Sequence, residues 1–153
     1  QKTKIRTNNP YKAKGSGDND LGDVYVEISI DRQTMWCYKN GQVVVETPVV
    51  TGDISKAGRA TPKNGCWPIF WKTTEYTMNG PRDENGTPEY TTFVHYWMPF
   101  NGGVGIHDLA SRGNNFGGDI YKTNGSHGCI NTPLAAVKTI YETVSVGTPV
   151  IVY

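Results

Sequence analysis

Hydrophobic and polar residues alternate along much of the chain from Val24 onward. Between Val24 and Ile30, aliphatic residues occupy every second position and Tyr, Glu and Ser stand between them. A period of two is typical of a half-buried β-strand. By the same criteria, further strands are predicted at Thr34–Lys39, Gln42–Val50, Gly65–Trp71, Thr91–Trp97, Gly103–His107 and Pro149–Tyr153.

The dipeptide Asn40-Gly41 separates the second and third of these strands. A two-residue hairpin turn needs positive φ at both central positions, which Asn and Gly tolerate best. The domain is therefore expected to open as an antiparallel meander. The segment from Thr73 to Tyr90 is expected to be a long loop.

A single segment, late in the chain, predicts a helix. Thr132 can cap it and Pro133 fits its first turn, and Gly147 can end it. Its hydrophobic residues share one face, namely Leu134, Val137, Tyr141 and Val144. Since strands and helices do not alternate, we expect a mainly β fold, sandwich-like or barrel-like, with one helix following Cys129.

The length of 153 residues favours one domain. Residues 1–23 are polar and contain several lysines, so they are expected to be a linker or the remnant of an upstream domain, with the folded domain at 24–153. The net charge is +1 and the basic residues form no long stripe, so nucleic acid is not an expected partner. The hydrophobic runs fall short of the roughly 20 residues that span a bilayer.

Three cysteines, an odd number, leave at least one free thiol in an exported protein. Cys37 and Cys66 lie within apolar strands and are expected to be inert core residues, although a disulfide between them stays open. Cys129 has a different setting. It follows a Gly- and Asn-rich loop and precedes the expected helix, where the helix dipole and backbone N–H groups would favour a thiolate.

A candidate catalytic pair emerges from these positions. His107 ends an apolar strand and can act as the base for Cys129, and Asp108 can orient its imidazole through either its side chain or its carbonyl. Gly128 leaves room beside the sulfur, so the N–H groups of Gly128 and Cys129 are candidate oxyanion donors. His95 is expected to be an ordinary half-buried histidine.

The segment Ser126-His127-Gly128-Cys129-Ile130-Asn131, with His107 upstream in a Gly-Ile-His context, resembles the signature of the L,D-transpeptidases. The similarity runs from about Val24 to Tyr153. Residues 108–125, 18 positions, separate the two motifs, slightly more than we expect for this family, so an insertion is expected between Ser111 and Lys122.

This resemblance implies a fold, an activity and a set of site residues. It implies a Gram-positive type of enzyme in which the Cys129 thiolate attacks a tetrapeptide stem of peptidoglycan, releases D-alanine and forms a 3-3 cross-link through a thioester. Carbapenems would acylate Cys129, and no cofactor is implied. The resemblance further implies a monomer located outside the cytoplasm, at the cell wall or cell surface. Besides the catalytic residues, substrate contacts are expected from Ser126, His127, Asn131, Tyr96, Trp97 and Met98.

Several alternatives remain open at this stage. Tyr96, Trp97 and Met98 can equally be core residues. His127 can be structural, a substrate contact or a second base. With water as acceptor the enzyme would be an L,D-carboxypeptidase. A zinc hydrolase using His107, His127 and Cys129 is a rival, although no His-Glu-x-x-His or Cys-x-x-Cys spacing occurs. A non-catalytic wall-binding module is the third possibility.

Overall fold

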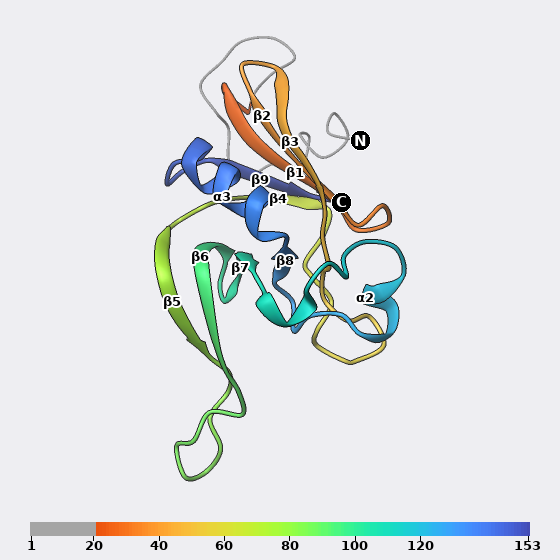
Figure 1. The fold of residues 1–153 in the computed structure, drawn as a ribbon, viewed down its shortest axis with the longest axis vertical. Helices are drawn as coiled ribbons and strands as arrows, with labels where there is room; N and C mark the ends of the chain where they lie inside the picture. The colour runs from red at the N-terminus through yellow and green to blue at the C-terminus, as the bar shows by residue number, and fades with distance from the viewer. Residues whose placement is uncertain (1–20) are drawn as a thin grey trace.

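The computed structural model describes residues 21–153, which form two β-sheets, a helix and short helical turns (Figure 1). The first sheet has five strands in the order β3-β2-β1-β9-β4 and the second has four in the order β5-β6-β7-β8. The strands are β1 (Val24–Ser29), β2 (Thr34–Lys39), β3 (Gln42–Pro48), β4 (Gly65–Pro68), β5 (Thr73–Asn79), β6 (Thr91–Asn101), β7 (Val104–Asp108), β8 (Ile130–Thr132) and β9 (Pro149–Val152). The mainly β prediction is confirmed.

The opening meander is also confirmed. Strands β1, β2 and β3 pair antiparallel, and Lys39 faces Gln42 across the turn between β2 and β3. Asn40 has a φ of 52° and Gly41 a φ of 78°, so both central residues adopt the left-handed conformation that this turn requires.

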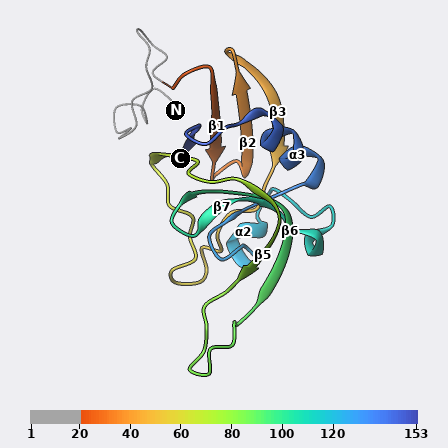
Figure 2. The same cartoon turned by 90° about the vertical axis from the view of Figure 1, so that its left-hand side faces the viewer.

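The predicted loop from Thr73 to Tyr90 is wrong over its first half. Strand β5 pairs antiparallel with β6, and together they form a hairpin that projects away from the rest of the molecule (Figures 1 and 2). Most β5 side chains are exposed or only partly buried, so neither face of the strand needs to be apolar. The alternation on which the sequence reading depends is therefore missing.

The helix after Cys129 begins later than predicted. Cys129 is followed by the short strand β8, and helix α3 spans Leu134–Thr143 with Pro133 at its N-cap. Thr132 does not cap the helix, because its hydroxyl donates to the Ile130 carbonyl at 3.1 Å. Leu134 is exposed, whereas Val137 and Ile140 are buried. Two helical turns were not predicted, the 3₁₀ turn η1 (Ala110–Arg112) and the single turn α2 (Ile120–Thr123).

Both sheets and α3 share one hydrophobic core. It includes Ile28 of β1, Met98 of β6, Ile130 of β8 and Ile140 of α3. A smaller cluster of Leu21, Tyr25, Cys66 and Ile151 lies at the other face of the first sheet. Leu21 is thus buried just ahead of the predicted domain start. The linker was predicted at residues 1–23. Residues 1–20 of it lie outside the described part of the chain.

Cys37 and Cys66 are fully buried and belong to different clusters. They form no disulfide with each other. Burial raises the pKa of Cys37 to about 11, so this thiol is protonated at neutral pH and unreactive.

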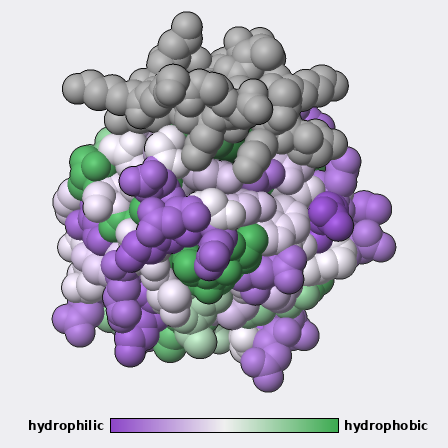
Figure 3. Space-filling view, turned by 90° about the horizontal axis from the view of Figure 1, so that it is seen from above, coloured by the Kyte–Doolittle hydropathy of each residue, from purple (hydrophilic) through white to green (hydrophobic). Residues whose placement is uncertain are grey.

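On the face seen in Figure 3, hydrophobic residues form small patches between hydrophilic ones rather than one continuous apolar surface. No helix within residues 21–153 has the length and hydrophobicity needed to cross a bilayer.

The hairpin turn gives a direct test of local backbone strain. Gly41→Ala places a Cβ at a φ of 78° in otherwise open space, so only the left-handed conformation opposes it. We expect a loss of about 1 kcal/mol in the free energy of unfolding, measured by urea denaturation. Gly103→Ala is the matched control, since its Cβ also meets nothing within 4 Å and its φ lies outside the left-handed range. Equal losses in both variants would contradict this reading of the turn.

Candidate active site

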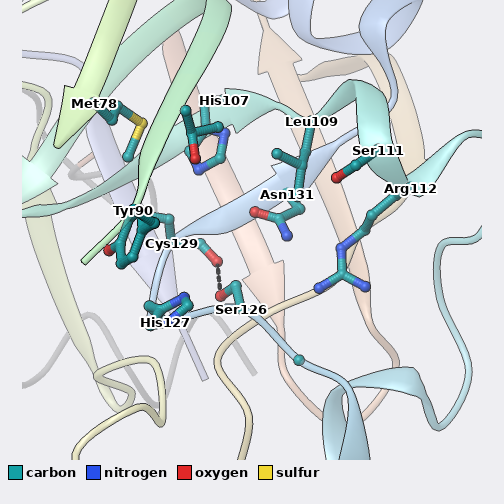
Figure 4. Close-up of a pocket in the computed structure, with 12 residues that line it drawn as sticks. Met78, Tyr90, His107, Leu109, Ser111, Arg112, Ser126, His127, Cys129 and Asn131 are labelled. Atoms are coloured by element: carbon teal, nitrogen blue, oxygen red, sulfur yellow. Dashed lines mark hydrogen bonds between the residues drawn. The ribbon is translucent and has the colours of Figure 1, made fainter. Parts of the chain in front are cut away.

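A cavity of about 280 Å³ opens between the second sheet and the loop that carries Cys129 (Figure 4). Residues from the β5–β6 hairpin form one side, the η1 turn forms the opposite side, and Cys129 and Asn131 lie between them. The lining residues are Met78, Tyr90, Thr92, His107, Leu109, Ser111, Arg112, Gly125, Ser126, His127, Cys129 and Asn131.

Strand pairing brings the two candidate catalytic residues to this cavity. Strands β7 and β8 run parallel, with His107 opposite Asn131. Cys129 directly precedes β8 and stands two residues before Asn131. The pairing therefore brings His107 and Cys129 to the same cavity, which both of them line.

The imidazole of His107 is held in one tautomer. Its Nδ1 lies 2.6 Å from the backbone carbonyl of Asp108. A carbonyl oxygen can only accept, so Nδ1 carries the proton and Nε2 is left with a free lone pair. Burial lowers the pKa of His107, an effect opposed by this hydrogen bond and by the charge of Asp108 and reinforced by Arg112. The ring is therefore neutral at pH 7 and able to accept a proton.

Asp108 orients His107 through its carbonyl, which decides between the two possibilities that the sequence left open. Its carboxylate faces β6, where it accepts from the backbone N–H groups of His95 and Tyr96 and from the His95 ring at 2.8 Å. Burial alone would raise the pKa of Asp108, but the hydrogen bonds from His95 and Tyr96 lower it. The side chain of His95 is 49% exposed, in line with the half-buried histidine that the sequence predicts, and its ring is a partner of this carboxylate.

The Cys129 thiol is not the preformed thiolate that the sequence reading expected. Its S–H donates to the Gly103 carbonyl at 3.3 Å. Burial raises its pKa to about 11, against a smaller opposing effect of the Gly105 N–H. The prediction that a helix dipole lowers this pKa is wrong, because β8 and Pro133 separate Cys129 from the helix.

The loop around Cys129 is fixed by hydrogen bonds. The Ser126 hydroxyl donates to the Cys129 carbonyl at 2.6 Å, drawn as a dashed line in Figure 4, and accepts from the Gly128 N–H at 3.1 Å. The Thr61 hydroxyl donates to the Gly128 carbonyl at 2.7 Å. Gly128 has a φ of 135°, which a residue with a Cβ rarely adopts.

This arrangement changes the assignment of the oxyanion donors. The Gly128 N–H donates to the Ser126 hydroxyl, so it is not available to an oxyanion, contrary to the prediction. The Cys129 N–H has no hydrogen-bond partner within residues 21–153. Cys129 is therefore the better candidate donor of the two.

Of the expected substrate contacts, Ser126, His127 and Asn131 line the cavity, but Tyr96, Trp97 and Met98 do not. Met98 is fully buried in the core, Trp97 stacks on Tyr76, and Tyr96 packs on Tyr141. They support the site from behind: the Trp97 ring lies 5.8 Å from that of His107.

His127 is an exposed side chain on the rim of the cavity. Its ring lies 4.7 Å from that of Tyr90. Burial, together with the charge of Arg59, lowers its pKa. This placement fits a substrate contact better than a second base, because His107 is the imidazole whose tautomer is fixed by a hydrogen bond within the cavity that Cys129 lines.

Sequence reasoning missed the opposite walls of the cavity. Met78 and Tyr90 come from the segment that was expected to be a loop, and Thr92 comes from the predicted strand that follows it. Ser111 and Arg112 lie in the segment where an insertion was expected, and Leu109 lies just ahead of it. The hydrophobicity of Met78 and Tyr90 in an otherwise polar stretch was the only available signal. Among residues 21–153, no group of three or more His, Cys, Asp or Glu side chains is close enough to hold a metal.

The protein is mainly β with two sheets, and a thiol and an imidazole line one cavity between the second sheet and the loop that carries Cys129. The family description of the YkuD L,D-transpeptidase catalytic domain matches residues 23–152. The chain belongs to this family.

Solved structures support this assignment. A mutant L,D-transpeptidase of Enterococcus faecium is 40% identical with a TM-score of 0.75, and the match covers 91% of this chain and 53% of that one. The catalytic domain of an E. faecium L,D-transpeptidase acylated by ertapenem is 41% identical with a TM-score of 0.72, covering 88% and 100%. An L,D-transpeptidase from Mycobacterium smegmatis is 28% identical with a TM-score of 0.70, covering 86% and 58%. The chain spans about half the length of the first of these. No curated protein matches it.

The carboxylate of Asp108 is expected to contribute to stability. The Asp108 carboxylate accepts hydrogen bonds from the backbone N–H groups of His95 and Tyr96 and from the His95 ring. In Asp108→Asn the amide NH₂ must face one of these donors, so at least one hydrogen bond is lost and the free energy of unfolding falls by roughly 1–3 kcal/mol. Because the pKa of Asp108 is lowered on folding, this difference should be full at pH 7 and shrink as the pH falls below about 4. Urea unfolding at both pH values measures this difference.

The control is Asp119→Asn, which breaks only an exposed ion pair with Lys122, so its free energy of unfolding should change little. A similar loss in the control would refute the assignment.

The raised pKa of Cys129 predicts how its alkylation depends on pH. Only the thiolate is alkylated, so with a pKa of about 11 the rate of iodoacetamide labelling should keep rising tenfold per unit above pH 9 in the folded protein. In the unfolded chain the rate should level off above about 8.5. Peptide mapping after short exposure identifies the labelled cysteine. A plateau below pH 8 in the folded protein would indicate a preformed thiolate.

Proposed function

We propose that this domain is a peptidoglycan L,D-transpeptidase that forms 3-3 cross-links through a thioester on Cys129. The observation that carries the proposal is the placement of a thiol and a neutral imidazole of fixed tautomer at the wall of one cavity, the imidazole on β7 and the thiol just before β8, which pairs with β7. The related E. faecium catalytic domain acylated by ertapenem supports acylation as the chemistry. A related enzyme has also been solved as an avibactam carbamoyl enzyme.

The first half-reaction transfers the donor stem to the enzyme. The free Nε2 of His107 takes the thiol proton as Cys129 sulfur attacks the carbonyl of the third stem residue. The developing oxyanion accepts a hydrogen bond from the Cys129 N–H. When the C–N bond breaks, His107 returns the proton to the leaving nitrogen, and D-alanine departs with its amine restored.

The second half-reaction releases the thioester. The amine of an acceptor stem attacks the thioester carbonyl while His107 accepts its proton. The carbon–sulfur bond then breaks, the thiolate takes the proton from His107, and a new amide joins the two stems. Water in place of the amine would give L,D-carboxypeptidase activity from the same intermediate.

Partners and location belong to the same proposal. Donor and acceptor stems of peptidoglycan are the substrates, carbapenems are covalent inhibitors, and the protein acts as a monomer at the cell wall or cell surface, outside the cytoplasm. These assignments rest on the family and on what related structures hold.

Two substitutions test the roles of the catalytic pair. Cys129→Ala should form no acyl-enzyme with a tetrapeptide stem or with a carbapenem, and His107→Gln should slow acylation by on the order of 10²–10⁴-fold, the usual contribution of a positioned base. Intact mass spectrometry measures the adduct, and analysis of the products separates cross-linking from hydrolysis.

Cys37→Ala is the control for the nucleophile, because this thiol is buried in the core and lies in a different strand. It should keep the adduct while Cys129→Ala loses it. Near-normal acylation of the folded Cys129→Ala or His107→Gln protein would refute the assigned roles, and an unmodified wild-type mass after prolonged incubation with several carbapenems would refute the proposed chemistry.

A further inference from the structure

Arg112 brings a positive charge to the catalytic cavity without a carboxylate to neutralise it. Its partly buried side chain lines both this cavity and an adjoining one, whose polar wall includes Asn115 and Asn124. The ion pairs recorded within residues 21–153 are His95 with Asp108 and Lys122 with Asp119, and neither involves Arg112.

A neutral amide holds the guanidinium in place. With the Asn131 amide turned so that its oxygen faces Arg112, that oxygen accepts from Nε at 2.8 Å and from Nη2 at 3.2 Å. Figure 4 shows the guanidinium at the side of the cavity opposite Met78 and Tyr90. Asn131 thus fixes the orientation of Arg112 but leaves its charge uncompensated, which is the arrangement of a site for an anionic ligand.

The position of Arg112 relative to the nucleophile indicates which anion it binds. Arg112 and Cys129 line the same cavity, and Asn131, which holds the guanidinium, stands two residues beyond Cys129. In a donor peptide whose scissile carbonyl meets the Cys129 sulfur, the carboxylate of the leaving residue lies three bonds beyond that carbonyl, so its oxygens reach about 4–5 Å from it. A leaving residue directed toward the η1 side of the cavity therefore brings its carboxylate toward the Arg112 guanidinium.

We propose that Arg112, oriented by Asn131, binds the terminal carboxylate of the leaving residue of the donor stem and thereby selects stems that end at that residue. The proposal rests on the proposed function. A stem extended by another residue places an amide where the carboxylate would be, so the charged interaction is lost. Arg112 is then a specificity-determining residue, and the adjoining polar cavity provides room for the leaving residue to depart.

The test compares two donors that differ only in charge, a tetrapeptide stem ending in D-alanine and the same peptide ending in D-alaninamide. Wild-type protein should acylate at least ~10-fold faster with the free carboxylate, because hydrogen bonds between charged groups are the stronger class.

Arg112→Gln should lose ~10–100-fold in kcat/KM with the carboxylate donor and little with the amide. Arg112→Lys should recover part of the preference. Arg32→Gln, a cation that lies over Trp36 in the other sheet, should behave as wild type.

An equal loss with both donors in Arg112→Gln, or a wild-type protein without preference, would overturn the proposal. A binding measurement separates this failure from a failure of the proposed function. In Cys129→Ala protein, titration with N-acetyl-D-alanine and N-acetyl-D-alaninamide followed by NMR should show carboxylate-selective shifts at Arg112 that Arg112→Gln abolishes. Selective binding without any peptide turnover would keep the anion site and refute the transpeptidase assignment, whereas absence of selective binding would refute the anion site.

Discussion

The parallel pairing of β7 with β8 is the constraint on which the site depends. The pairing sets His107 opposite Asn131 and brings Cys129, which directly precedes β8, to the cavity that His107 lines. A register shift of one residue would turn the Asn131 side chain to the other face of the sheet. Further backbone hydrogen bonds flank this pair of strands on both sides. β6 pairs with β7, and Val50 exchanges backbone hydrogen bonds with Asn131 at 2.9 Å in each direction. A three-residue strand is thus held between two neighbours, which compensates for its small size.

Burial then determines the electrostatic state of the pair. It lowers the pKa of His107 and raises that of Cys129, so the resting site holds a neutral imidazole and a neutral thiol rather than an ion pair. A neutral pair is cheaper to bury than two charges. In the proposed mechanism the charges on thiol and imidazole arise only during attack on the substrate carbonyl, so the positioned base has the larger part and the acidity of the resting thiol the smaller.

Much of this could be predicted from the sequence where local chemistry dictates structure. The Asn40-Gly41 turn, the alternating strands and the Ser126–Asn131 motif are encoded within a few residues each. The failures have a common cause, which is tertiary context. Strand β5 lacks an apolar face because it projects from the body, and Cys129 acquires its high pKa from packing rather than from the nearby helix. Likewise, only the fold reveals that Trp97 packs behind His107 instead of lining the groove.

The walls of the cavity differ in how firmly the fold holds them. The wall with Cys129 is tied by buried hydrogen bonds from Ser126 and Thr61, and its backbone continues into the core at Ile130. The wall with Met78 and Tyr90 belongs to a hairpin whose side chains are largely exposed. Local stability follows buried apolar contact, so the catalytic wall is the rigid one and the hairpin wall is the one able to adjust. If the proposed function holds, the chemistry depends on the rigid wall, while the wall that adjusts contacts the substrate.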